Sequence, residues 1–305
     1  MPLTLLSVSA ETEVAIVEMG ANHQQEIAFL CQIAQPTHGL ITNIGRAHLE
    51  GFGGPEGVRK GKGELFDYLE QTSGTVFVNH DDLVLEEMAF HGHFEKTVYY
   101  GKEAHCLVSG EIVENVPLLK INWWLNADSS TQKHQLQTNL TGSYNLDNLL
   151  AAVAIGIFFG LSAEEINAGI SGYQPSNNRS QILQTETNTL ICDYYNANPS
   201  SMEVAIKNLE AITADKKVLI LGDMFELGEH SSAEHELIII KANEIKAERI
   251  FIGKAFYQHH AVFTDTFFET TDAAFIALKS DPIKNATILI KGSRGMKLEN
   301  LLELL

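Results

Sequence analysis

The sequence predicts an α/β protein with two parallel-sheet domains, residues 1–175 and 176–305. Short apolar runs alternate with segments whose apolar residues recur at helical spacing, as in strands joined by crossover helices. The alternation is interrupted at residues 174–181, a polar segment with a proline that we interpret as a hinge. A length of 305 residues accommodates two domains of ordinary size.

The first domain begins with apolar runs that we predict to be buried strands of a parallel sheet. Between them lie two segments with apolar residues at helical spacing, residues 24–35 and 56–71. The predicted strands are residues 13–20, 38–45 and 74–82.

Residues 97–140 contain four short strand-like runs separated by turn residues, which predict an antiparallel flap on this sheet. A buried helix is predicted over 145–160 and a second over 162–173. In the second of these, Ser162 is expected to cap the helix while Glu165 reaches back to it.

The second domain repeats the alternation of strands and helices and resembles a small Rossmann-like domain. Helices are predicted at 231–247 and 271–281. The predicted strands are residues 190–199, 216–224, 249–253 and 286–295, the first and second ending in loops.

Composition excludes several classes of function. The formal net charge is −18 and no run of basic residues exists, so a nucleic-acid backbone would be repelled. Cys31, Cys106 and Cys192 lack CxxC spacing, which argues against a disulfide framework or a thiolate zinc site. We predict that all three are reduced packing residues.

The sequence also predicts a cytoplasmic protein. The longest apolar stretch, residues 149–161, is shorter than the ~18 to 20 residues of a membrane span and is expected to be a buried helix. The first twenty residues lack the basic start and cleavage pattern of a signal peptide.

Residues able to do chemistry cluster after the predicted strands. In an open α/β sheet, ligands bind at the carboxyl ends of the strands. The residues found at such ends are Glu18, Asn43, His48, Asp193, Asp223, Lys291, Ser293 and Arg294.

Two of these residues are candidate metal ligands. Glu18 offers a hard oxygen of the kind that Mg²⁺ takes, and the alternative is a carboxylate paired with a nearby base. His48 either joins Glu18 through a ring nitrogen or makes an ordinary loop hydrogen bond. Lys62 is expected near a glycine-rich helix start, where it would meet a phosphate or a metal-bridging group, and Lys60 is equally placed by spacing.

Three further segments carry polar side chains that could serve either structure or ligand binding. Asn145 and Asn148 begin a predicted helix, where an amide either caps the helix or recognises the edge of a base. Arg179 in the hinge either bridges a phosphate or is solvated. The segment "DYYNANPSS", residues 193–201, is dense in polar groups for a structural turn, and its proline suits a helix entry.

Taken together, these motifs resemble the Mur ligase family along nearly the whole chain. The matching stretches, in order, are "VEMGANHQQEIA", "ITNIGRAHLEGFG", "KGELF", "GSYNLDNLLAA", "NNRSQ", "DYYNANPSSM", "LGDMFELGE" and "LIKGSRGMKLE". The stretches "YNANP", "GDMFELG" and "KGSRGM" favour the member that adds a dipeptide over those that add alanine, glutamate or the third residue.

The resemblance implies an ADP-forming acid–amino-acid ligase of peptidoglycan precursor synthesis. ATP would phosphorylate the terminal carboxylate of UDP-N-acetylmuramoyl-tripeptide, and the amine of D-alanyl-D-alanine would attack the acyl phosphate. The cofactors implied are ATP and Mg²⁺. The chemistry is coherent because a carboxylate becomes electrophilic once its oxygen is a phosphate leaving group.

The resemblance also implies roles for individual residues. Glu18 and His48 would bind Mg²⁺, and Lys62 would become carbamylated and bridge the metal region. Asn145 and Asn148 would contact adenine, Asp193 the ribose and Arg179 the phosphates. Residues expected near the reacting centre are Tyr195, Asn196 and Asn198, and those expected to hold the dipeptide or the acceptor peptide are Lys291, Ser293 and Arg294.

One departure limits what this chain is expected to do alone. The family carries a phosphate-binding loop, G-x-x-G-K-[ST], and an N-terminal domain that grips the UDP sugar, and neither occurs in these 305 residues. We therefore expect the chain to be the larger C-terminal part of such a ligase, inactive by itself and poorly soluble because a sheet edge is unpaired. The alternatives are a nucleotide- or peptide-binding module without catalysis, and a related folylpolyglutamate or cyanophycin-type synthetase.

Overall fold

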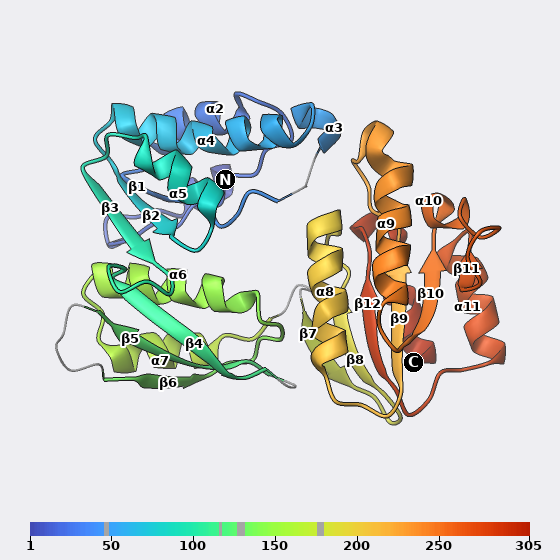
Figure 1. Cartoon of the computed structure of the whole chain (residues 1–305). Coiled ribbons are helices and arrows are strands. Elements are labelled where there is room, and N and C mark those ends of the chain that lie inside the picture. The colour runs from blue at the N-terminus through green and yellow to red at the C-terminus, as the bar shows by residue number, and fades with distance from the viewer. Residues whose placement is uncertain (46–48, 116–117, 127–131, 176–179) are drawn as a thin grey trace. The chain divides into compact units, whose positions relative to one another are not determined.

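The computed structural model describes residues 1–45, 49–115, 118–126, 132–175 and 180–305, and Figure 1 labels its elements. It confirms the α/β class, with two sheets whose strands are mostly parallel. The chain divides into two compact units. Unit 1 comprises Met1–Ser109, Trp124–Thr131 and Leu150–Gly160, and unit 2 comprises Gly110–Trp123, Gln132–Leu149 and Leu161–Leu305.

The first sheet has the strand order β1-β2-β3-β4-β5-β6. Its strands are β1 (His38–Leu40), β2 (Thr75–Asn79), β3 (Lys96–Tyr100), β4 (Val108–Glu114), β5 (Lys120–Leu125) and β6 (His134–Gln137). Strands β1 to β4 pair in parallel, whereas β5 and β6 pair antiparallel.

Helices cover both faces of this sheet around β1 and β2. Helices α4 and α5 contribute Phe66, Leu69 and Leu85 to a cluster with Val76 and Val78 of β2, and the end of α6 places Phe158 against His38 and Phe77 on the other face. The helices that precede the second sheet along the chain are α1 (Pro2–Leu6), α2 (Glu26–Ala34), α3 (Leu49–Phe52), α4 (Pro55–Gln71), α5 (Leu83–Phe90), α6 (Asn145–Phe158) and α7 (Ala163–Gly172).

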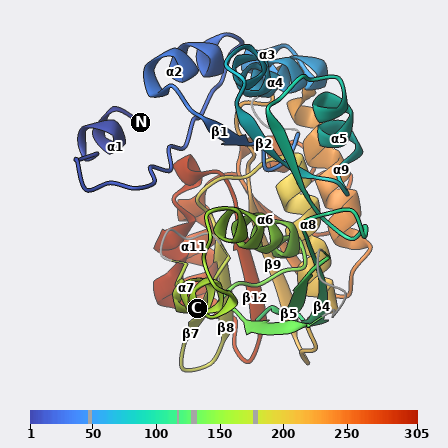
Figure 2. The same ribbon diagram turned by 90° about the vertical axis from the view of Figure 1, so that its left-hand side faces the viewer.

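The strand predicted at residues 13–20 does not form. Figure 2 shows this segment, between α1 and α2, as an extended chain without a strand arrow. Val14 is 50% exposed and Ile16 is 83% exposed. A strand needs a hydrogen-bonded neighbour to satisfy its backbone, and no strand among the described residues pairs with this run.

The antiparallel flap predicted at 97–140 is wrong at its start and confirmed at its end. Strand β3 continues the parallel sheet and pairs in parallel with β4, whereas β5 and β6 pair antiparallel. The parallel pairing of β2 with β3 depends on α5, a helix that the sequence analysis missed. It returns the chain to the start of the sheet, as a parallel connection requires, and Asp82 caps it by accepting from the N–H groups of Val84 and Leu85.

The second sheet has the strand order β11-β10-β9-β12-β8-β7 and lies entirely in unit 2. All neighbouring strands are parallel except β7 and β8. The strands are β7 (Gln181–Gln184), β8 (Thr189–Asp193), β9 (Lys217–Gly222), β10 (Glu248–Ile252), β11 (Thr266–Phe268) and β12 (Thr287–Lys291).

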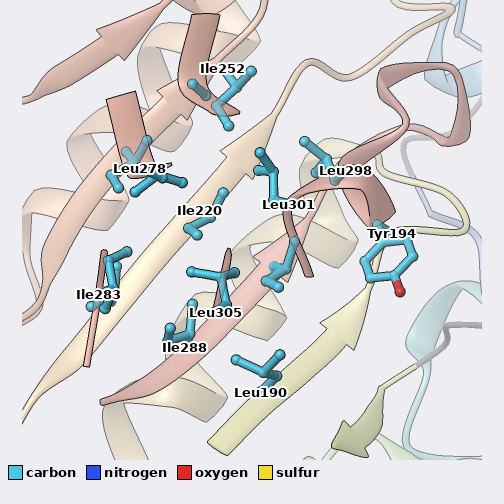
Figure 3. Packing of buried hydrophobic residues seen from close by; sticks show 14 of the residues in the cluster. Leu190, Tyr194, Ile220, Ile252, Leu278, Ile283, Ile288, Leu298, Leu301 and Leu305 are labelled. Carbon is cyan, nitrogen blue, oxygen red and sulfur yellow. The ribbon is translucent and has the colours of Figure 1, made fainter. Parts of the chain in front are cut away.

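The core of unit 2 is formed around this sheet. Figure 3 shows Leu190, Ile220, Ile288 and other strand residues packed against Leu298 and Leu301. Alternate residues of the same strands point to the opposite face, where α8 and α9 lie in Figure 1. The helical elements here are α8 (Pro199–Ala211), η1 (Gly228–His230), α9 (Ser231–Asn243), α10 (Lys254–Tyr257), α11 (Thr271–Ser280), η2 (Arg294–Met296) and η3 (Leu298–Leu304).

Two local predictions are confirmed. Ser162 and Glu165 form a reciprocal capping box at the start of α7. Cys31, Cys106 and Cys192 are free and buried, and burial raises the pKa of each thiol to about 11, so the reactive thiolate is scarce at neutral pH. Separately, none of the helices in the described ranges has the length and apolar character that crossing a membrane demands.

Candidate functional site

The carboxyl edge of the second sheet brings together two predicted site residues, Asp193 and Lys291. They are the last residues of the neighbouring parallel strands β8 and β12, and they lie opposite each other in register. Lys291 Nζ lies 2.6 Å from Asp193 Oδ2, and Lys291 is only 2% exposed. Lys291 also donates to the carbonyl oxygen of Asn196 at 3.2 Å. A buried ammonium is therefore neutralised by the carboxylate beside it.

Hydrogen bonds extend this pair to Tyr144. The N–H of Ser180 donates to Asp193 Oδ1 at 3.3 Å, and the hydroxyl groups of Ser180 and Tyr144 are hydrogen-bonded to each other. Burial and then the negative charge of Asp193 raise the pKa of Tyr144 to about 12. Tyr144 thus remains a neutral hydroxyl at any physiological pH.

These groups line a recess within unit 2. Its empty space is about 360 Å³, part of it open to solvent, and its walls include Thr141, Gly142, Tyr144, Asp193 and Asn208. Gly142 has a φ of +89°, and a Cβ there would overlap the Tyr144 ring and the Asn208 amide. Glycine is required at this position both for its backbone conformation and for the close approach of its neighbours.

Asn145 and Asn148 lie together at the start of α6, one turn apart. The Asn145 amide donates to the Thr141 carbonyl at 2.7 Å and accepts from the Asn148 amide at 3.1 Å. Asn145 is buried and Asn148 is exposed. The Asn145 side chain thus fixes the turn that carries Thr141 and Gly142, and the exposed Asn148 is the more available of the two for a ligand.

The loop after β8 holds the next group of predicted residues. Asn198 is the N-cap of α8 and forms a capping box with Ser201, and Pro199 occupies the first helical turn as predicted. Asn196 is exposed, and its side chain accepts from the N–H of Ala197. A structural role therefore accounts for Asn198, whereas the hydrogen bond of the Asn196 side chain is to the adjacent residue.

The loop after β12 approaches the same region. The Arg294 guanidinium lies over the Tyr195 ring, 5.5 Å from its centroid, and Arg294 is exposed. Ser293 is buried, and its hydroxyl oxygen accepts from the N–H of Phe225 at 2.9 Å. Ser293 thus ties two loops together, and Arg294 presents a positive charge to solvent.

Lys62 lies in unit 1, in the middle of the seventeen-residue helix α4. The expected location near the helix start is wrong, because α4 already begins at Pro55. Lys62 Nζ donates to the carbonyl of Asn43 at 2.8 Å. Burial lowers the pKa of this amine, partly opposed by the charge of Asp82. Lys60 is exposed and Lys62 is half-buried. The structure therefore distinguishes two lysines that sequence spacing alone left equivalent.

Of the two residues expected to bind Mg²⁺, Glu18 lies among the described residues and His48 does not. Glu18 is exposed and, since residues 13–20 form no strand, does not lie at a strand end. His48 and Arg179 lie outside the described residues. Within the described ranges no three His, Cys, Asp or Glu side chains are grouped so as to hold a metal ion. Since Mg²⁺ is usually held by one or two carboxylates together with several waters, the magnesium site stays a prediction.

Sequence reasoning missed most residues of the recess, among them Tyr144, Ser180 and Asn208. Tyr144 stood beside the asparagines in "GSYN", and an aromatic residue before a polar helix start was the available signal. Ser180 and Asn208 gave none, because only the fold brings a residue before β7 and a residue of α8 to the same recess.

Two family models match the chain. The Mur ligase middle domain matches residues 1–156, and the Mur ligase glutamate ligase domain matches residues 178–294. Together they cover the segments that contain Lys62, Asn145, Asp193 and Lys291.

Individual relatives agree with these models. A UDP-N-acetylmuramoyl-tripeptide–D-alanyl-D-alanine ligase of Bacillus subtilis is 29% identical over 316 residues, which is 99% of this chain and 66% of the relative. The enzyme of that name from Escherichia coli is 31% identical over 313 residues, 100% of this chain and 68% of the relative. A crystal structure of MurF from Acinetobacter baumannii superposes with a TM-score of 0.87 at 27% identity, covering 99% of this chain and 66% of that one.

The chain thus spans about two thirds of the length of these proteins. The two domain models follow each other in the order in which the two sheets occur, and the relatives align from end to end of the chain. The chain belongs to the Mur ligase family.

Proposed function

We propose that this chain is the nucleotide- and dipeptide-handling part of an ADP-forming ligase that joins D-alanyl-D-alanine to UDP-N-acetylmuramoyl-tripeptide. The names of the relatives support this substrate pair. So do the stretches "YNANP" and "KGSRGM", which contain residues of the Asp193 and Lys291 region. On the same basis we propose that the reaction belongs to cell-wall precursor synthesis in the cytoplasm. We also propose that the domain boundary lies between residues 175 and 176.

The observation that carries the proposal is the Asp193–Lys291 pair at the carboxyl edge of the second sheet, beside the recess. An open α/β sheet binds ligands at this edge. The Asp193 carboxylate would accept a hydrogen bond from a ribose hydroxyl. Asn148 and Asn145 lie at the helix start beside the recess and would contact adenine. Lys291 was expected to contact a peptide substrate directly. We propose instead that Lys291 holds Asp193 in place through their ion pair.

The amine substrate would lie along the loops after β8 and β12. D-Alanyl-D-alanine ends in a carboxylate, and Arg294 offers an exposed guanidinium stacked on Tyr195. Ser293 fixes the backbone of this loop. Asn196 would face the reacting centre, and Asn198 would orient the loop by capping α8.

The acyl-phosphate chemistry would depend on groups in unit 1. We propose that Lys62, whose pKa is lowered by burial, is the amine that becomes carbamylated, since a neutral amine is the form that reacts with CO₂. We also propose, from the family resemblance, that Glu18 and His48 bind Mg²⁺ and that Arg179 contacts the nucleotide phosphates. When bound, Mg²⁺ would neutralise charge on the transferring phosphate.

The test is ADP release with ATP, UDP-N-acetylmuramoyl-tripeptide and D-alanyl-D-alanine, each omitted in turn. It is run on the 305-residue chain and on the longest polypeptide that its gene encodes. We expect release that requires both peptide substrates from a polypeptide carrying a phosphate-binding loop, and little or none from the 305 residues alone. If neither polypeptide releases ADP in response to both substrates, the proposed function is wrong.

A matched pair of variants tests the site. Asp193→Asn should raise the KM for ATP, since the amide is a weaker acceptor for the ribose and no longer neutralises Lys291. Asp215→Asn, an acidic residue with no place in the site, should leave the KM for ATP unchanged. An unaltered KM in Asp193→Asn would remove Asp193 from the nucleotide site.

A further inference from the structure

Helix α2 is capped by a residue from another helix. Its N-cap residue, Gln25, has a φ of 70°, and the Gln25 side chain makes no capping hydrogen bond. Instead, the Gln25 N–H donates to Glu64 Oε1 and the Ala28 N–H donates to Glu64 Oε2 at 2.9 Å. Glu64 lies in the middle of α4.

In this arrangement a residue of another helix accepts the hydrogen bonds that, in a capping box, are accepted by residues of the capped helix itself. In a capping box the N-cap side chain accepts from the N3 N–H, and the N3 side chain accepts from the N-cap N–H. Here one carboxylate accepts from both the N-cap and the N3 residue, Gln25 and Ala28. Its negative charge also lies at the positive end of the helix. Charge-assisted bonds to backbone N–H groups are among the stronger hydrogen bonds of proteins.

The segment before α2 is fastened to this helix at several points. Glu26, in the first turn, accepts from the N–H groups of Asn22 and His23 at 2.7 and 3.1 Å. Further back, the Met19 sulfur lies 3.8 Å from the buried Cys31 sulfur on α2. The position of Glu18, next to Met19, therefore follows the position of α2.

The same helix α4 also holds the segment after β1. Two residues before Glu64, Lys62 donates to the Asn43 carbonyl at 2.8 Å. Along a helix, residues two apart point to different sides, which is consistent with Glu64 reaching α2 while Lys62 reaches Asn43. One helix thereby fixes both the segment that follows Glu18 and the segment that precedes His48.

We propose that Glu64 is a positioning residue of the ligase reaction, which fixes α2 and the Glu18–Gln25 segment relative to Lys62 through its two bonds to the start of α2. This role rests on the proposed function of the site. The role assigned to Glu64 requires no contact with substrate or cofactor. It acts through the backbone of another helix, so that the carboxylate of Glu18 and the amine of Lys62 are presented in one geometry.

The test compares Glu64→Gln and Glu64→Asp with Asp67→Asn, an exposed residue of the same helix. Glutamine keeps one acceptor and turns an NH₂ group toward the other N–H, and aspartate is too short to span both. Amide hydrogen exchange at Gln25 and Ala28 should become about ten-fold faster in Glu64→Gln, the factor expected for one lost charge-assisted bond. Asp67→Asn should exchange like the wild type.

Kinetics of ADP release then separate positioning from simple stability, in whichever polypeptide is active. Glu64→Gln should lower kcat about ten-fold or more with the KM for D-alanyl-D-alanine unchanged, because misplacement of the reacting groups affects the transition state and the dipeptide loops are untouched. Unchanged exchange at Gln25 and Ala28, or faster exchange with an unchanged kcat below the melting temperature, would overturn the proposal. If the wild type releases no ADP while the exchange difference persists, the proposed function has failed and the capping contact stands.

Discussion

Individual buried polar side chains hold the loops at the carboxyl edge of the second sheet. His235 is fully buried on α9, and its Nε2 accepts from the N–H of Met224 at 3.0 Å. Its Nδ1 donates to the Ser231 carbonyl at 2.7 Å. The ring is therefore the neutral tautomer with the proton on Nδ1. The loop at Met224 continues to Phe225, which donates to Ser293, so His235 stabilises a loop that adjoins the candidate dipeptide region.

Protonation of His235 should weaken the fold at low pH. Burial lowers the pKa of His235 below its usual value of 6.5, although the nearby Asp223 carboxylate acts in the opposite direction. A histidine with a lowered folded pKa contributes stability that is present above pH 6.5 and is lost as the pH falls through the folded pKa. We expect the free energy of unfolding to fall as the pH decreases below about 6.5.

The measurement is urea unfolding at pH 8 and pH 5 for the wild type and His235→Gln. Glutamine can accept from the Met224 N–H but does not titrate, so the loss of stability between the two pH values should be smaller in this variant. His260→Gln, an exposed histidine, serves as the control and should show the full loss. Equal losses in the wild type and His235→Gln would show that His235 does not control this pH dependence.

At the scale of elements, helix entries decide where the candidate groups lie. Asn198 begins α8 by accepting from the Ser201 N–H at 2.9 Å, while Ser201 Oγ accepts from the Asn198 N–H at 3.1 Å. The same turn ends the segment that carries Tyr195 and Asn196. The sequence "NPSS" could therefore be interpreted either as chemistry or as a cap, and the structure shows the cap.

Asn198→Ala should lower the free energy of unfolding by about 1 kcal/mol, the usual cost of losing an N-cap acceptor. Asn198→Asp should retain most of the stability, because a carboxylate caps as well as an amide. Urea unfolding checks both. If Asn198→Asp keeps its stability and loses ligase turnover, Asn198 has a second role at the reacting centre. If Asn198→Ala is as stable as the wild type, the capping box contributes little.

At the scale of the whole molecule, the first thirty residues expose large apolar side chains. Leu3, Leu6 and Ile16 are each more than 80% exposed, and Phe29 on α2 is 60% exposed. Isolated apolar residues on a surface are ordinary, but several within one short segment favour association. The net charge of −18 opposes close approach of two copies.

We expect the chain to self-associate as its concentration rises, and more so at high salt, where charge repulsion is screened. Light scattering at low and high salt measures the average mass. The triple variant Leu3→Lys, Leu6→Lys and Ile16→Lys should raise the monomer fraction, whereas Leu83→Lys, an equally simple change at an exposed leucine elsewhere, should not. A monodisperse monomer under all conditions would contradict both this expectation and the poor solubility predicted from the sequence.

The sequence by itself determined the α/β class, most strands and helices, the buried cysteines and the capping box of α7. These follow from local patterns, since the hydrophobic period and the capping residues act within a few positions along the chain. The family followed from motifs that are contiguous in sequence. The boundary between residues 175 and 176 and the individual roles of the site residues remain predictions.

Only the tertiary structure decided which groups meet. Residues 13–20 have the pattern of a strand, but no described strand pairs with them, because pairing depends on a neighbour and not on the segment itself. Lys62 and Lys60 look alike in sequence, and only the fold half-buries Lys62 and bonds it to the Asn43 carbonyl, while Lys60 stays exposed. Asp193 and Lys291 are far apart along the chain and form an ion pair because β8 and β12 are adjacent in the sheet. Contacts between distant segments depend on topology, which local patterns do not encode.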